Sequence, residues 1–576
     1  MNTPARPSIA SCWSLWCIVA IAVATGRAPA QDKRVFDGLN AWLIAHGKGE
    51  LDLTKERITK SAIGVRAGVV SPESVGETTH LKELGAFCRA VVKSDGATSA
   101  EALLEVAAVG LDRAQKLTVE QRPESVRRIG EEQLDALKSP EALGAIETFA
   151  KDEAKGARAL LIRAAALRAL GRRHDEKFFP VIEAALPHKE LVVRLGAAEA
   201  AQSAEPRALV KPIATALRTE TDAELIAAMV DALRKTLVKH KEQVGEDDLR
   251  HSVDATLAAL GKGDWRSDLA AVEYLAIARS AASVPALIDV LARQVEDAKE
   301  AETKESKRAA ELRSGMLRQR AWDALVSLTG ARFPYDQVDS WQRWWEKIRD
   351  EFKVVDAPEG KEKDGVTSTG SSFFGIPVRG SRVLFIVDTS GSMREPMRAG
   401  STVTTGFAGK PKMEAAKHEL TAVVEKLTAD CAFNMVWFSS QGELWSKDMV
   451  EANAKNKKRF ATSVADLRAD GATNLWEGLR LGLKLESFTN GAQYGQNYDE
   501  VFILSDGIPT LGDVRDPKEL LGLIRETNRY SRVVINTIYI AGDPENERKG
   551  AEFAGMSGAE FMRKIAEENG GRNLTL

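Results

Sequence analysis

The stretch that decides the fold is residues 383–393, which read VLFIVDTSGSM. Its first five residues are apolar, and a short run of β-branched and aromatic residues is typical of a strand buried on both faces. The run ends in a carboxylate and two hydroxyls, at Asp388, Ser390 and Ser392. In open α/β sheets, ligands bind at the carboxyl ends of the strands. Because hard cations prefer oxygen donors, the stretch predicts a site for Mg²⁺, with Mn²⁺ or Ca²⁺ as alternatives.

The sequence around this strand alternates between strand-like and helix-like segments. Apolar runs at 432–438, 501–504 and 533–540 are separated by segments with helical periodicity. Strands that alternate with helices require a mostly parallel sheet with helices on both faces. Residues 373–576 are therefore predicted to form a doubly wound, Rossmann-like α/β domain.

Two further loops supply oxygen donors at element boundaries. Residues 470–474 (DGATN) precede a predicted helix and contain Thr473, and residues 504–510 (LSDGIPT) follow the central strand and contain Asp506. In a doubly wound sheet these loops can converge with the first on one edge. Taken singly, Thr473 could instead cap the helix that follows, and Asp506 could belong to an ordinary turn.

Residues 381–576 resemble a von Willebrand factor type A domain. All five positions of that family's metal-ion-dependent adhesion site hold the expected residues: Asp388, Ser390, Ser392, Thr473 and Asp506. The resemblance implies that the three hydroxyls coordinate the cation directly and that the two carboxylates act through water. It also implies that the last coordination position is left for a carboxylate of a protein partner.

The chain departs from the compact family pattern at residues 394–411 (REPMRAGSTVTTGFAGKP), an insertion directly after the first loop. Loops on a rigid scaffold often mediate recognition, so the insertion could set partner choice or cover the site. A tolerated surface insertion is the other interpretation.

Residues 31–352 are rich in Ala and Leu and have helical periodicity throughout. A pair of helices recurs at a spacing of 31 positions, from Arg163 to Arg194 and from Leu186 to Leu217. This period predicts an α-solenoid that resembles HEAT repeats, and an irregular helical bundle is the alternative. Tryptophans clustered in residues 321–352 predict a terminal cap, with a ligand platform as the second interpretation.

The remaining segments divide the chain. Residues 353–372 are rich in Gly, Ser, Lys and Glu and predict a flexible linker between the helical domain and residues 373–576. Residues 1–30 have a basic start, a short apolar core and a small-residue cleavage pattern that ends at Ala30. This pattern predicts a secretory signal peptide, with an uncleaved anchor as the alternative, and a periplasmic or extracellular mature chain without a transmembrane segment.

Composition excludes several classes of function. The 576 residues have a formal net charge of −3, which gives no electrostatic reason to expect nucleic acid as a partner. The mature chain would retain only Cys88 and Cys431, too few for a disulfide framework. The sequence contains no H-E-x-x-H, phosphate-loop or G-x-S-x-G pattern, so no catalytic residue is assigned.

We therefore predict an exported, metal-dependent protein-binding protein of the adhesion or scaffold kind. A divalent cation held by the type A domain would coordinate an acidic side chain of a partner, and the helical repeats would offer a second interaction surface. The alternative is an envelope assembly scaffold whose metal is purely structural. In a third class, a metal-dependent hydrolase, Asp388 and Asp506 would position a metal-activated water, but no motif requires it.

Overall fold

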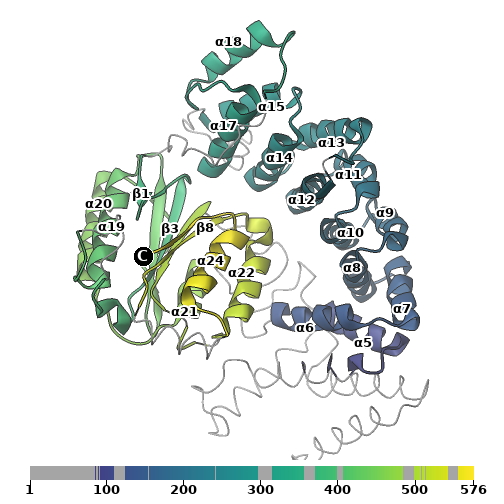
Figure 1. The fold of residues 1–576 in the computed structure, drawn as a ribbon, viewed down its shortest axis with the longest axis horizontal. Coiled ribbons are helices and arrows are strands. Elements are labelled where there is room, and N and C mark those ends of the chain that lie inside the picture. Colours follow the sequence, from purple (N-terminus) through teal and green to yellow (C-terminus); the bar gives the residue numbers. More distant parts are fainter. Residues whose placement is uncertain are drawn as a thin grey trace, which may run out of the picture. The chain divides into compact units, whose positions relative to one another are not determined.

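The computed structural model (Figure 1) describes the following residues: 85, 88, 89, 91–108, 123–153, 155–240, 242–295, 314–355, 370–397, 406–483, 498–507, 509–512, 514–542 and 555–576. The predicted signal peptide, most of the predicted linker and the middle of the insertion lie outside these residues. By its internal contacts the chain divides into two compact units, Met1–Leu209 with Ser487–Asn490, and Val210–Glu486 with Gly491–Leu576.

The first unit is helical. Its described helices are α5 (Ala97–Ala107), α6 (Pro123–Ala136), α7 (Pro140–Lys151), α8 (Ala157–Gly171), α9 (Phe179–Ala185) and α10 (Leu191–Ala204). The backbones of α8 and α10 approach so closely that a Cβ on Gly171 would lie 2.4 Å from the Ala200 carbonyl oxygen. This close approach explains why small residues dominate these two helices.

Two arginines at equivalent positions of the predicted repeat make equivalent hydrogen bonds in the first unit. Arg163 on α8 donates to the carbonyl oxygen of Ala150 (3.1 Å), in the last turn of α7. Arg194 on α10 donates to the carbonyl oxygen of His188 (2.9 Å), just after α9. Each guanidinium therefore satisfies carbonyl groups at or just beyond the end of the preceding helix. The shared role supports the repeat interpretation.

The second unit begins with more helices: α11 (Val210–Leu217), α12 (Ala223–His240), α13 (Glu246–Ala259), α14 (Trp265–Ala278), α15 (Ser283–Val295), α17 (Gly315–Thr329) and α18 (Val338–Ile348). Trp341 on α18 is fully buried in a core that includes residues of α15 and α17. Its ring packs edge-on against Phe333 and Trp344, with centroid distances of 5.2 and 6.1 Å. This packing favours the terminal cap over a ligand platform.

A mostly parallel sheet follows, so the predicted order of a helix-rich region and then an α/β region is confirmed. Its strands are β3 (Arg382–Asp388), β4 (Ala432–Phe438), β5 (Gly442–Leu444), β6 (Val450–Glu451), β7 (Glu500–Ser505), β8 (Val534–Tyr539) and β9 (Asn573–Thr575). Their order is β5-β4-β3-β7-β8-β9, with β6 also paired to β4. The pairs β3–β4, β3–β7, β7–β8 and β8–β9 are parallel, whereas β5 and β6 run antiparallel to β4.

Helices cover both faces of this sheet, as the alternating pattern predicts. Figure 1 shows α19 (Lys412–Lys426) and α20 (Ala454–Asp466) on one face, and α21 (Leu475–Gly482), α22 (Pro517–Ser531) and α24 (Gly558–Glu568) on the other. Phe385 of β3 belongs to the core beneath α19 and α20. Ile386 faces the other way, because a Cβ on Gly482 of α21 would lie 2.5 Å from its Cδ1 atom. β3 is therefore buried on both faces, as predicted. Ahead of it, β1 (Ser372–Phe373) and β2 (Ile376–Pro377) form a separate two-stranded sheet.

The amino-terminal ends of the strands contact the helices of the same unit. The Ser314 hydroxyl, at the start of α17, donates to Asp499 Oδ2 (2.8 Å), which directly precedes β7. The guanidinium of Arg532, between α22 and β8, pairs with Asp231 of α12 (2.7 Å) and Glu273 of α14 (2.5 Å). The helices from α11 onward therefore share a compact unit with the sheet, while the predicted boundary at residues 353–372 stays a prediction. Among the described residues, no helix combines the length and hydrophobicity needed to cross a bilayer.

Candidate metal centre

Asp388 is the last residue of β3 and its side chain is fully buried. Its Oδ1 atom accepts a hydrogen bond from the Ser390 backbone N–H (2.8 Å), and its Oδ2 atom accepts one from the Ser505 hydroxyl (2.6 Å). Burial and, after it, the nearby Asp506 carboxylate raise the pKa of this carboxyl from 3.8 to about 6, although the hydroxyl and N–H donors oppose the shift. A buried carboxyl near a second carboxylate is an arrangement that a cation would stabilise.

The two serines of the first loop continue this network toward the third loop. The Ser390 and Ser392 hydroxyl oxygens lie 3.0 Å apart, and the Ser392 hydroxyl donates to Asp506 Oδ1 (2.8 Å). Gly391, between the serines, donates its N–H to the Gly471 carbonyl oxygen (2.9 Å) of the second loop. The first loop therefore contacts both of the others, as the sequence predicts for loops that converge on one edge.

Thr473 lies in the second loop, and its side chain is 6% exposed. Its backbone N–H donates to the Thr510 hydroxyl (3.1 Å) of the third loop, and a Cβ on Gly507 would lie 3.8 Å from the Thr473 Oγ1 atom. The residue that caps α21 is Asn474, not Thr473. Within the described part of the chain, the Thr473 hydroxyl has no hydrogen-bond partner, so its oxygen is free to accept a ligand.

Asp506 lies just beyond the end of β7 and is paired with a cation that the sequence analysis did not anticipate. Its Oδ2 atom accepts from Lys412 Nζ (2.8 Å), and the same ammonium donates to Glu395 Oε2 (3.0 Å). The Lys412 side chain is 1% exposed. The sequence contained one indication of this pairing, because Lys412 begins the segment of helical periodicity that follows the insertion. A cation at the start of a helix opposes the helix dipole and needs a compensating anion.

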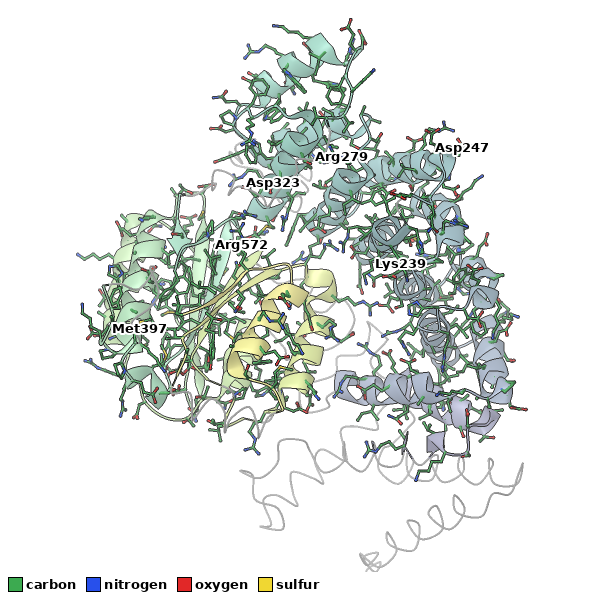
Figure 2. The ribbon with its side chains drawn as sticks, viewed as in Figure 1. Lys239, Asp247, Arg279, Asp323, Met397 and Arg572 are labelled. Carbon is green, nitrogen blue, oxygen red and sulfur yellow. The ribbon has the colours of Figure 1, made fainter. Side chains whose placement is uncertain are left out.

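The predicted insertion begins and ends as a paired hairpin stem. The Met397 N–H donates to the Lys410 carbonyl oxygen (2.8 Å), and the Lys412 N–H donates to the Glu395 carbonyl oxygen (2.9 Å). Pro396 and Pro411 form an antiparallel bridge between these bonds. In Figure 2, Met397 lies toward the end of the sheet where the three loops meet, whereas Arg572 lies toward its other end. We refer to residues 395–397 and 409–412 as the stem.

Supporting residues that the sequence analysis missed hold the loops in place. Besides Ser505, the Ser440 hydroxyl, in the loop after β4, accepts the Ala472 N–H (3.0 Å) and so fixes the second loop. The Thr389 N–H donates to the Phe438 carbonyl oxygen (2.7 Å), which fixes the first. Serines and threonines in loops are common, so nothing in the sequence distinguished these from unremarkable turn residues.

The donors fit a hard divalent cation. The five predicted residues contribute only hydroxyl and carboxylate oxygens, gathered where three loops meet. Among the described residues, no group of three or more His, Cys, Asp and Glu side chains is close enough to hold a metal ion. A zinc site of the usual nitrogen and sulfur ligands is therefore absent from that part of the chain, whereas an oxygen set with hydroxyls suits Mg²⁺.

Comparisons with known proteins agree with this fold. Residues 383–508 match the family model for the von Willebrand factor type A domain. The inter alpha-trypsin inhibitor, heavy chain 4, of Mus musculus is 24% identical over 198 residues, which are 34% of this chain and 19% of that protein. The inter-alpha-trypsin inhibitor heavy chain H3 of Homo sapiens is 29% identical over 149 residues, which are 25% of this chain and 15% of that protein.

Among solved structures, a von Willebrand factor type A protein from Catenulispora acidiphila is similar at 18% identity and a TM-score of 0.24, covering 34% of this chain and 38% of that one. The matched segment spans less than a fifth of the two curated relatives. Domains of the matching family commonly bind a divalent metal. The chain therefore contains a von Willebrand factor type A domain that includes residues 383–508.

Proposed function

We propose that this chain is an exported, metal-dependent protein-binding protein. Type A domains generally act as protein interaction modules. The observation that carries the metal dependence is the Thr473 hydroxyl, which belongs to a mostly buried residue, has no hydrogen-bond partner among the described residues, and faces the third loop, where Asp506 lies. A hydroxyl oxygen that the protein does not engage, close to two loops that supply further oxygen donors, is suited to coordinate a hard cation.

In this proposal Ser390, Ser392 and Thr473 hold Mg²⁺ directly, and Asp388 and Asp506 act on it through water. Mn²⁺ and Ca²⁺ are the alternative ions. When bound, the cation supplies a Lewis acid that accepts a carboxylate from the partner protein. The chain's own residues do the positioning: Ser505 orients the Asp388 carboxylate, and the Ser392 hydroxyl orients that of Asp506.

The rest of the proposal concerns the chain outside the metal centre. The apolar start of the sequence supports export, by a signal peptide cleaved after Ala30. The helices from α5 to α18 support a HEAT-like array that gives a second interaction surface. No catalytic role is proposed.

Calorimetric titration of the mature chain, residues 31–576, with Mg²⁺ alone tests the metal site. The whole mature chain is used because the strands contact helices of the same unit. We expect Thr473→Ala to weaken Mg²⁺ binding by about tenfold or more, because a direct ligand is lost. The matched control is Thr462→Ala on α20, whose hydroxyl is exposed and bonds only within its own helix. Equal affinity in wild type and Thr473→Ala would contradict the proposed ligand set.

Affinity capture from an envelope extract, with Mg²⁺ or with EDTA, tests the function. We expect capture of a protein partner that is lost with EDTA and lost in Thr473→Ala, but retained in Thr462→Ala. Capture that survives EDTA and Thr473→Ala would favour the alternative, an assembly scaffold whose metal is purely structural. This alternative is considered because the sheet contacts helices α12, α14 and α17, as expected of a domain that is part of a larger scaffold.

A further inference from the structure

Lys412 is a buried cation that the proposed function leaves without a role. Its side chain is 1% exposed, and its ammonium lies 2.8 Å from Asp506 Oδ2 and 3.0 Å from Glu395 Oε2. Burying a lysine is costly unless carboxylates pair with it. One of the two carboxylates that pair with Lys412, that of Asp506, also belongs to the proposed metal centre.

We propose that Lys412 is a built-in counter-cation of the metal centre, which stabilises the metal-free state and competes electrostatically with the divalent ion. This inference rests on the proposed function, because it concerns the affinity of the same site. Lys412 acts through Asp506 and is a positioning residue, not a metal ligand.

The charges around Asp506 indicate that Lys412 stabilises the metal-free state. Asp388 and Asp506 place two buried carboxylates in adjacent loops, and Lys412 is the cation that the structure pairs with the second of them. Without the ammonium, the metal-free protein would hold both negative charges away from water with their repulsion uncompensated. With it, the site is preformed before any metal arrives.

The hydrogen bonds of the Asp506 carboxylate indicate that Lys412 also lowers the affinity for metal. Its Oδ1 atom accepts from Ser392 and its Oδ2 atom accepts from Lys412 (both 2.8 Å), so both oxygens are engaged by the protein. A divalent ion that enters this site meets a carboxylate whose charge is already partly neutralised, and it is repelled by the ammonium itself. Lys412 therefore lowers the affinity for metal while it preserves the geometry of the site.

Glu395, in the stem, is the second carboxylate that compensates the charge of Lys412. It shares the Lys412 ammonium through its side chain and accepts the Lys412 N–H through its carbonyl oxygen (2.9 Å). Removing the negative charge of Glu395 leaves the full charge of the ammonium facing Asp506. The two substitutions, Lys412→Met and Glu395→Gln, are therefore expected to change metal affinity in opposite directions.

The test is Mg²⁺ calorimetry and thermal unfolding of the mature chain, with Mg²⁺ and with EDTA. We expect Lys412→Met to bind Mg²⁺ about tenfold or more tightly than wild type, because one unit of repulsive charge is gone from a poorly solvated site. In EDTA its melting temperature should fall, and saturating Mg²⁺ should recover most of the loss. A merely structural role for Lys412 would weaken metal binding, not strengthen it.

Two further variants complete the experiment. Glu395→Gln should bind Mg²⁺ more weakly than wild type, and it tests the inference even if Lys412→Met does not fold. Lys457→Met is the control, because its ammonium donates to the carbonyl oxygens of Glu425 and Leu427, at the opposite end of α19 from Lys412. Its Mg²⁺ affinity should equal that of wild type.

The outcomes separate the inference from the proposed function. If wild type binds Mg²⁺ but Lys412→Met binds it equally or more weakly, or Glu395→Gln binds it more tightly, the counter-cation is overturned and the metal site stands. If neither wild type nor Lys412→Met binds Mg²⁺, the proposed function fails and the inference fails with it. Binding by Lys412→Met but not by wild type would support the inference strongly.

Discussion

The two ends of the sheet each bury a pair of carboxylates, and they treat them differently. At the amino end, Asp499 and Glu500 are adjacent in sequence and almost fully buried. Glu500 accepts hydrogen bonds from the N–H groups of Arg379 (2.8 Å) and Gly380 (2.7 Å) and from the Asn536 amide (2.8 Å). Asp499 accepts from the Arg382 N–H (3.0 Å) and the Ser314 hydroxyl (2.8 Å).

At the carboxyl end, the partners of Asp388 and Asp506 are mostly movable groups. Apart from one backbone N–H, they are the hydroxyls of Ser505 and Ser392 and the flexible ammonium of Lys412. Backbone donors are fixed by the fold and tie a carboxylate to one structural task, whereas hydroxyls can turn their lone pairs toward a cation. Burial of acids alone therefore does not distinguish the two ends of the sheet, whereas the balance between backbone and side-chain donors does.

The largest effect that would test this comparison is at the amino end. We expect Asp499→Ala to lower the free energy of unfolding by about 3 kcal/mol, because it leaves the buried Ser314 hydroxyl and the Arg382 N–H without their acceptor. Urea denaturation of the mature chain, with and without Mg²⁺, measures this loss. Mg²⁺ should not restore it. Recovery by Mg²⁺ would mean that the two ends are not separate in function.

A pH effect of similar or smaller size is expected from Glu500. Burial raises the pKa of its carboxyl from 4.5 to about 7, although the N–H donors oppose the shift. Because the folded protein holds this proton more tightly than the unfolded chain, stability should fall as pH rises from about 4.5 to about 7, by up to about 3 kcal/mol, and then level off. Denaturation across this pH range measures the slope.

Glu500→Gln removes the titrating group, so its stability should decline less over the same pH interval. The control is Glu443→Gln on β5, an exposed glutamate whose replacement should leave the wild-type slope unchanged. A slope that is equal in wild type and Glu500→Gln would assign the pH dependence to other groups.

The smallest effect on stability is expected at the carboxyl end. We expect Asp388→Asn to change the free energy of unfolding in EDTA by only about 1 kcal/mol or less, because a lost hydrogen bond is offset by removing a buried charge that faces Asp506. Its Mg²⁺ affinity should nevertheless fall by about a hundredfold, as calorimetry would show. A large loss of stability with unchanged Mg²⁺ affinity would reverse the comparison and make Asp388 a structural residue.

Most of the sheet and of the proposed ligand set could be predicted from the sequence. The apolar strand at 383–387 and the alternation of strands with helices are local patterns, and the five predicted residues lie in three loops that end or precede such elements. Short-range periodicity reports how a segment is buried, so these features follow from neighbouring residues. Lys412 could not be assigned in this way, because its partner Asp506 is 94 positions away.

The sequence by itself determined that residues 383–393 form a buried strand that ends in oxygen donors, that two later loops supply Thr473 and Asp506, and that a helical region precedes the sheet. Only the tertiary structure decided which of these groups are already bonded. The placement of β3 between β4 and β7 brings the three loops together, leaves the Thr473 hydroxyl without a partner among the described residues, and directs a buried ammonium at Asp506. The physical reason is that strand order sets which distant side chains meet, and no local pattern encodes that order.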